Sequence, residues 1–436
     1  MRARGLVSRL PGQRSAGAGP VSGHAARPPA PARDAPAQAA TVQPGFALLF
    51  STPLLHGFKR LDARPVGFAP LPEPAASQLA QWRDAAQTHV LGPAFLQAAR
   101  LQRTELGRIT LQQADAEAPR HADVALLTHV AGVAVWEAWL SAPPQGFDPQ
   151  RWVDWIDPDR PDSIAAAVWQ HIAPLNHALS GRSAFSAYLP LSVIRLPDVL
   201  LDDWLPEHAE RVIALLWRDR LGRALKPEVV ETELARDTCA RVGGITLMGR
   251  RSALDLHDWR DDSAAEAAQL QLPPRSALPF LVTLELLAIE RAVLQRLYDR
   301  IAHAAPQTIE GLLALKKDVI DGLEEYYGST LASTRFNDVV AAQGEDMLGI
   351  VDLFDAVSDR LEMLSFTLTT AYQQRMTALQ FWLTVVFGAT EIGFIAASIA
   401  TWYYASGVGT VLAWTVGAAA LSGGILVALL RRKIRD

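Results

Sequence analysis

The hydrophobic pattern of the chain is strongest near its C-terminus, where two long apolar runs follow each other. Residues 378–404 contain a single charged side chain, Glu391, and residues 408–430 contain none. A bilayer core about 30 Å thick is crossed by roughly 20 apolar residues in a helix. The alternative is a buried hairpin inside a large soluble domain, but two apolar runs of this length are uncommon there. The pattern therefore predicts a membrane protein with a two-helix transmembrane hairpin.

The flanks of the two runs predict their orientation. Residues 431–436 read Arg-Arg-Lys-Ile-Arg-Asp, whereas the connector at residues 405–407 carries no charge. Because cationic flanks stay on the cytoplasmic side, the hairpin is expected to have both ends in the cytoplasm, together with the bulk of the chain. The outer interface then receives the aromatic side chains of Trp402, Tyr403 and Tyr404.

A heptad pattern precedes the first run and continues into it. Apolar residues recur at alternating spacings of three and four, which is typical of a coiled-coil seam. The pattern predicts one helix of about 65 residues, weakened at its start by Gly344 and Gly349. It forms the end of a helical stalk over residues 277–377, which also contains helices over residues 278–305 and 308–331. The seam consists of Met347, Ile350, Phe354, Val357, Leu361, Leu364, Leu368 and Ala371.

A polar row runs beside this seam at seven-residue intervals and enters the membrane segment. It consists of Thr370, Thr377, Thr384, Glu391 and Ser398. A carboxylate at the bilayer centre costs about 2.5 kcal/mol or more, so Glu391 is expected to face protein or water. In an oligomer the row would line a pore, with Glu391 binding cations. Alternatively, Glu391 only fixes the packing of a helix interface, and the hydroxyls bond to their own helix.

The middle of the chain reads as a soluble domain over residues 45–274. Strand-like runs alternate with helical patterns there, which predicts an α+β or α/β cytoplasmic domain. Gly132 interrupts one run and indicates two strands that meet at a turn. The expected strands are residues 46–50, 108–112, 123–139, 185–194 and 245–250, and the expected helices are residues 74–89, 163–179 and 207–225.

Composition narrows the class of function. The net charge of −5 and the absence of a basic patch argue against nucleic acid as a partner, and Cys239 is the only cysteine. Residues 1–44 are rich in Ala, Pro and Arg and are expected to form a disordered tail, a transit peptide or an overextended start.

No catalytic motif is found, so an enzyme is not expected. Asp157, Asp159 and Asp162 offer oxygen ligands to a hard cation, although a proline-stiffened turn explains them as well. A further acidic group, Asp255, Asp258, Asp261 and Asp262, is expected to be solvated.

The order of mixed domain, long helices, two C-terminal spans and basic tail resembles the CorA-type divalent-cation transporters. The resemblance implies a homopentamer in the bacterial inner (plasma) membrane that conducts Mg²⁺, or Zn²⁺ in the ZntB-like branch. It implies a pore lined by the first span, with Thr377, Thr384, Glu391 and Ser398 as candidates. The family's Gly-Met-Asn signature is absent, and Trp402-Tyr403-Tyr404-Ala405-Ser406-Gly407 takes its place. Its selectivity ring therefore does not carry over, and Trp402, Tyr403, Tyr404 and Ser406 become the candidates at the outer mouth.

Two hypotheses follow. In the first, the chain forms an oligomeric divalent-cation channel or transporter that needs no resident cofactor. In the second, the hairpin is an anchor, and the soluble domain is a binding, scaffold or signalling module.

Overall fold

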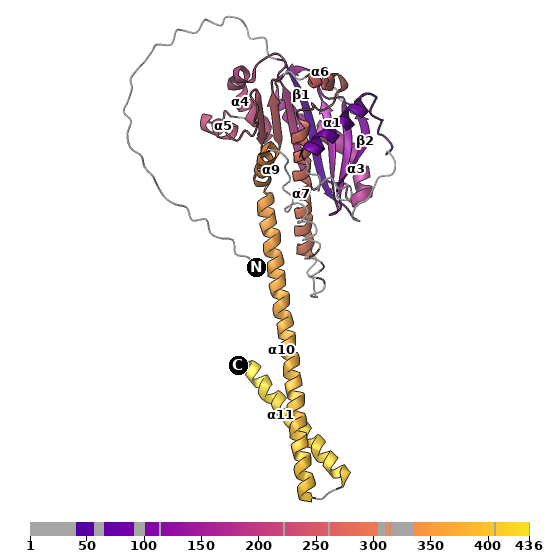
Figure 1. The fold of residues 1–436 in the computed structure, drawn as a ribbon, viewed down its shortest axis with the longest axis vertical. Coiled ribbons are helices and arrows are strands. Elements are labelled where there is room, and N and C mark those ends of the chain that lie inside the picture. Colours follow the sequence, from indigo (N-terminus) through magenta and orange to yellow (C-terminus); the bar gives the residue numbers. More distant parts are fainter. Residues whose placement is uncertain are drawn as a thin grey trace, which may run out of the picture. The chain divides into compact units, whose positions relative to one another are not determined.

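The computed structural model describes residues 41–435 except residues 56–64, 91–100, 113–114, 221–222, 260–261, 304–310, 312–313, 315–316, 318–334 and 405–406. The domain at the N-terminal end of this range is built on one mixed β-sheet (Figure 1). Its strands are β1 (Thr41–Pro53), β2 (Leu101–Thr110), β3 (His121–His129), β4 (Val133–Ser141), β5 (Gln145–Gly146), β6 (Ala187–Arg195), β7 (Gly244–Met248) and β8 (Ala253–His257).

The strands lie in the order β2-β3-β4-β1-β6-β8-β7, with β5 attached to the start of β1. The pairing of β6 with β8 is parallel, and the other pairings are antiparallel. β3 and β4 form a hairpin whose turn contains Gly132 at φ 76°, as the glycine in that run predicts. β1 begins at Thr41, so the last residues of the predicted tail belong to the sheet.

Both faces of the sheet are buried, and β1 shows why. Ala47 and Leu49 pack into one core, whereas Phe46, Leu48 and Phe50 pack into the core on the opposite face. Successive side chains of a strand point to opposite faces, so a strand covered on both sides reads as a continuous apolar run. The sequence Gly-Phe-Ala-Leu-Leu-Phe meets this requirement.

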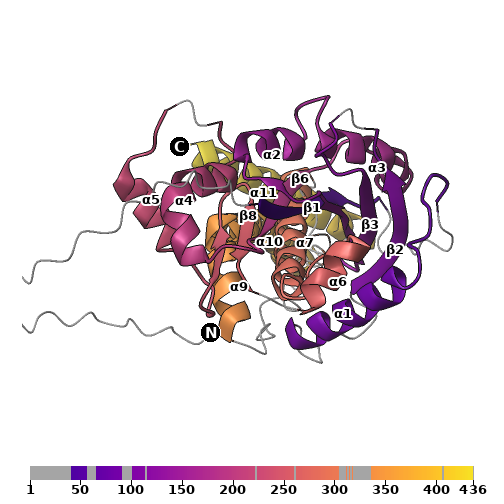
Figure 2. The ribbon, with the colours of Figure 1, turned by 90° about the horizontal axis from the view of Figure 1, so that it is seen from above.

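Helices cover the two faces as separate layers, which Figure 2 shows from above. One face carries α2 (Pro149–Ile156), α3 (Ile164–Ser180), α4 (Leu201–Trp217) and α5 (Pro227–Leu234). The other carries α1 (Ala75–Val90), α6 (Asp262–Leu270), α7 (Leu278–His303), α9 (Arg335–Met347) and the start of α10 (Ile350–Tyr404). This is an α/β domain, in agreement with the predicted class.

Several details differ from the predicted elements, and one predicted helix is not tested. The helix expected at residues 207–225 is α4, which ends where Arg218 adopts a left-handed conformation at φ 55°. β8 was not expected, and it buries Asp255, which is only 6% exposed, so the prediction of a solvated Asp255 is wrong. The helix expected at residues 308–331 lies almost entirely outside the described residues.

The long helix is also interrupted once. Gly349 has φ 66°, a left-handed conformation that ends α9 at Met347 and lets α10 begin at Ile350. Glycine adopts this conformation without steric cost, so the break falls at a residue that was expected only to weaken the helix. The predicted helix of about 65 residues is therefore wrong at its start. α10 itself runs without interruption for 55 residues.

The C-terminal region consists of α10 and α11 (Val408–Arg435). Both helices are long and apolar enough to cross a membrane, with mean hydropathies of 1.6 and 1.5 in their most apolar segments. In these segments only 11% and 0% of the residues are buried, unlike those of a core helix in a soluble domain. The structure thus combines an α/β sheet domain with two exposed apolar helices.

Candidate functional site

The four candidate pore residues lie along the apolar part of α10. Thr377, Thr384, Glu391 and Ser398 are all exposed. Glu391 and Ser398 share one surface of the helix with Phe387, Phe394 and Ile395. In the described part of the chain, no hydrogen bond or ion pair reaches the Glu391 carboxylate. This surface therefore places an acid among apolar side chains without a partner from its own chain.

The hydroxyls of the row bond to their own helix. Thr377 Oγ1 donates to the carbonyl of Gln373, and Thr384 Oγ1 donates to that of Gln380, each at 2.8 Å. Ser398 Oγ donates to Phe394 in the same way at 2.8 Å. Each hydroxyl hydrogen is thereby satisfied inside the helix, while the oxygen keeps lone pairs that point outward.

The heptad seam packs within the chain. Ile350 and Val357 are buried in the core that α7 forms on the sheet, and Met347, Phe354, Leu361 and Leu364 pack at its edge. The side chains of Leu368 and Ala371 lie outside the described residues. The seam therefore joins α10 to α7, and in these turns it leaves little apolar surface for a coiled coil between subunits.

Small residues form the contact between α10 and α11. A Cβ added at Gly393 would lie 3.1 Å from the Thr415 carbonyl oxygen and 3.2 Å from Ala419 Cβ. One turn earlier in α10, Ala389 Cβ lies 3.6 Å from the position that a Cβ would occupy at Gly423. Both helices thus present small residues four positions apart, the pattern that permits close approach of membrane helices.

Of the three aspartates considered as cation ligands, Asp157 and Asp162 are paired with protein donors, whereas Asp159 contributes only its backbone amide. Asp157 Oδ1 accepts bonds from the Asp159 amide and from Arg218 Nη2, each at 3.2 Å. Asp162 accepts from Arg160 at 2.9 Å. Among the described residues, no group of three or more His, Cys, Asp or Glu side chains could hold a metal ion. This segment has the geometry of a turn between α2 and α3.

The candidates at the outer mouth are only partly described. Trp402 is 83% exposed at the end of α10. The side chains of Tyr403 and Tyr404, and the whole of Ser406, lie outside the described residues.

Sequence reasoning missed a cluster of buried charges in the sheet domain. Glu137 of β4 lies on the sheet face that α1 and α7 cover, and it is fully buried. Arg83 Nη1 of α1 donates to Glu137 Oε2 at 3.0 Å, and Arg103 of β2 also pairs with this carboxylate. Arg103 Nη1 reaches Glu285 Oε1 of α7 at 2.8 Å. The cluster ties the sheet to both helices.

The two carboxyl groups of the cluster titrate in opposite directions. Burial alone raises the pKa of Glu137, but Arg103 and Arg83 outweigh this effect and hold its pKa well below the usual range. Burial raises the pKa of Glu285 to about 8, although Arg103 opposes the shift. Glu285 is thus largely protonated at neutral pH, and Glu137 with the half-exposed Glu105 balances the two guanidinium groups.

Comparisons with known proteins leave the family open. No family model matches the chain, and none of the curated proteins matches it. Among solved structures, the chain is similar to the full-length CmaX protein, with 13% identity and a TM-score of 0.24. The match covers 56% of this chain and 89% of that chain. A likeness at this level carries no argument, so membership of the CorA-type family stays a prediction.

Proposed function

We propose that the protein is an oligomeric membrane protein that moves divalent cations along an axis lined by α10. In this proposal the second half of α10 and α11 form a transmembrane hairpin with both ends in the cytoplasm, on the same side as the sheet domain. The helix upstream of the membrane acts as a stalk. The observation that carries the proposal is Glu391, which is exposed on an apolar helix surface and has no partner among the described residues.

The energetics favour a shared axis over contact with lipid. A carboxylate facing acyl chains costs about 2.5–3.5 kcal/mol on insertion scales, and this cost falls when the group meets water or other protein. Self-association that turns Glu391 inward also places the outward lone pairs of Thr384 and Ser398 around the same axis. Oxygen ligands of this kind suit hard divalent cations such as Mg²⁺.

The packing of α10 supports one location for the proposed contacts between subunits. The seam residues Ile350 and Val357 already pack into the core with α7. We therefore assign the contacts between subunits to the proposed membrane part of α10. The pentamer implied by the CorA-type resemblance is part of this proposal. The ion is left at the level of divalent cations, because the Gly-Met-Asn signature is absent.

A second candidate function is a non-conducting, membrane-anchored binding module. It is favoured by a cavity of about 570 Å³ in the sheet domain. In this case Glu391 fixes only the packing between copies, and the activity lies in the sheet domain.

Cation flux into proteoliposomes loaded with a Mg²⁺-sensitive dye separates the two functions. We expect flux with the wild type, a decrease of at least tenfold with Glu391→Gln, and no change with Glu362→Gln, an exposed acid in the earlier part of α10. A monomer in detergent, or equal flux in all three proteins, contradicts the transport proposal. The absence of flux from every protein favours the anchor.

A further inference from the structure

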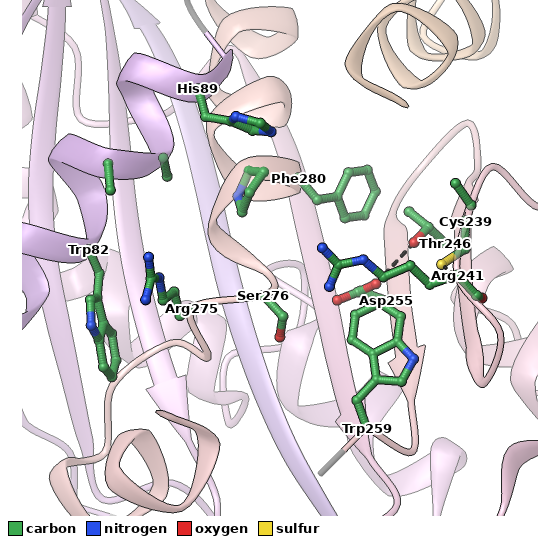
Figure 3. A pocket seen from close by; sticks show the side chains of 14 residues that line it. Trp82, His89, Cys239, Arg241, Thr246, Asp255, Trp259, Arg275, Ser276 and Phe280 are labelled. Atoms are coloured by element: carbon green, nitrogen blue, oxygen red, sulfur yellow. Dashed lines mark hydrogen bonds between the residues drawn. The ribbon is translucent and has the colours of Figure 1, made fainter. Parts of the chain in front are cut away.

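A cavity of about 570 Å³ opens on the face of the sheet that α1 and α7 cover, next to β7 and β8. Figure 3 shows its walls. α1 contributes Trp82, and α7 contributes Phe280. The segments before β7 and after β8 contribute Arg241 and Trp259, and Arg275 with Ser276 precede α7. Segments that are far apart in the sequence thus converge on one hollow.

Two guanidinium groups at this cavity lack an acidic partner. Within the described residues, no carboxylate lies within salt-bridge distance of Arg241 or Arg275. Arg241 lies over the Trp259 ring, with its Cζ 5.1 Å from the ring centroid. Stacking of this kind holds the guanidinium while leaving its N–H groups free for an anion. The cavity therefore has cationic donors that no carboxylate of the described residues pairs with.

The aromatic wall is held in place. Trp259 Nε1 donates to the Val242 carbonyl at 2.8 Å, and the ring stacks on His257 with centroids 5.0 Å apart. Gly244 makes room for this ring, because a Cβ there would lie 2.6 Å from Trp259 Cζ2. Trp82 and Phe280 also line the cavity, which therefore offers aromatic apolar surfaces suited to a planar ring.

Hydrogen-bond acceptors complete the site. Asp255 is 6% exposed, and its Oδ1 accepts from Thr246 Oγ1 at 3.0 Å. The Ser276 hydroxyl is buried and has no hydrogen-bond partner. Asp255 can accept from hydroxyl or amino groups of a ligand, and Ser276 can donate or accept. Among the buried polar atoms that lack a partner in the described residues, the Ser276 hydroxyl is the one that lines this cavity, where a bound ligand can supply the partner.

We propose that this cavity binds a nucleoside monophosphate. The phosphate pairs with Arg241 and Arg275, the base packs against the aromatic walls, and the sugar hydroxyls or the amino group donate to Asp255. A planar ring, an anion and several donors occur together in this class of ligand. A simple carboxylate or an inorganic phosphate would satisfy only the guanidinium groups. The site is independent of the proposed transport function.

Equilibrium binding to the full-length protein in detergent tests the proposal with three probes. AMP carries both ring and phosphate, adenosine lacks the phosphate, and ribose 5-phosphate lacks the ring. We expect AMP to bind at least tenfold more tightly than either of the others. AMP that fails to bind at millimolar concentration, or that binds no better than adenosine or ribose 5-phosphate, overturns the proposal.

Variants place the binding at this cavity. Arg275→Gln alters an exposed side chain and is expected to raise the Kd for AMP at least tenfold, whereas Arg251→Gln, exposed at the β7–β8 turn, leaves it unchanged. Cys239 lines the cavity and is the only cysteine, so AMP should also slow its alkylation at least threefold in the wild type. An unchanged Kd in Arg275→Gln and in Arg241→Gln, or unprotected Cys239, contradicts the assignment.

Discussion

The sheet domain and the apolar part of α10 each place a glutamate among apolar side chains, but the two glutamates differ in their partners. Glu137 is surrounded by Arg83 and Arg103 from its own chain. Glu391 has no such partner in the described residues, and it points away from the α10–α11 contact. The Glu137 cluster is electrostatically complete within a single chain. The described part of α10 and α11 does not supply such a partner to Glu391, which is why the proposed function places Glu391 on a shared axis.

The first test of this comparison removes Glu137, the acid at the centre of the buried charge cluster. Glu137→Gln leaves two buried guanidinium groups facing an amide, and loss of one partner from a buried ion pair costs about 3–5 kcal/mol. We expect the free energy of unfolding to fall by this amount in urea titrations followed by tryptophan fluorescence. Asp162→Asn removes an exposed partner of Arg160 and serves as the control, with no measurable change expected. Equal effects of the two substitutions would show that the cluster is not a stabilising centre.

A second test addresses how the membrane helices hold together without charges. Gly393→Val forces a side chain against the Thr415 backbone, and overpacking of this kind costs about 1–3 kcal/mol. The midpoint of unfolding by SDS in mixed micelles should fall accordingly. Gly388→Val is the matched control, because a Cβ at Gly388 meets no atom within 4 Å. If both variants unfold at the same SDS fraction, the small-residue contact does not hold α11 against α10.

A third test concerns Glu290, an acid that belongs neither to the Glu137 cluster nor to the apolar part of α10. Burial, and to a lesser extent Glu345, raises the pKa of Glu290 on α7 to about 8. Between about pH 4.3, the usual pKa of an unfolded glutamate, and about pH 8, the folded protein keeps a proton that the unfolded chain has released. Its stabilising contribution is therefore complete below this window and is lost as the pH rises through it, by up to about 1.4 kcal/mol per pH unit.

Urea unfolding at pH 5.5, 6.5 and 7.5 measures this slope. Glu290→Gln should flatten it, whereas the wild type and Glu228→Gln, a substitution at an exposed acid of α5, should keep it. Glu285 contributes with the same sign in all three proteins, so the difference between variants is the informative quantity. Parallel slopes in all three proteins would contradict a buried, protonated Glu290.

The periodic features of the chain could be predicted from the sequence, and the long-range ones could not. The apolar runs and the hairpin at Gly132 depend on spacings within a few residues, and the structure shows both. The heptad seam is described only in part, with a break at Gly349 and with Ile350 and Val357 packed against α7. The charge cluster joins Arg83 to Glu285, which lie 202 residues apart. The one local signal was Glu137, an acid inside an otherwise apolar strand. Such a residue requires a partner, although the sequence does not show which one.

The remaining errors have local causes. β8 is short, and two of its residues, Asp255 and His257, are polar, so its sequence does not read as a buried strand. Asp255 was therefore predicted to be solvated. The cavity is assembled from four separate segments, none of which has a motif of its own. The seam was recognised, but its partner was not, because a heptad pattern does not distinguish a helix of the same chain from one of a second copy.

The central position of β1 has a consequence for synthesis of the protein. β1 is the first strand to leave the ribosome, yet its neighbours in the sheet are β4 and β6, and β6 begins only at Ala187. At about 5–20 residues per second, β6 is synthesised on the order of ten seconds after β1. One edge of this nearly wholly buried strand stays unpaired for that time. Nascent chains stalled in this interval should need chaperones most, and release after Arg195 should relieve that need before the apolar helices emerge.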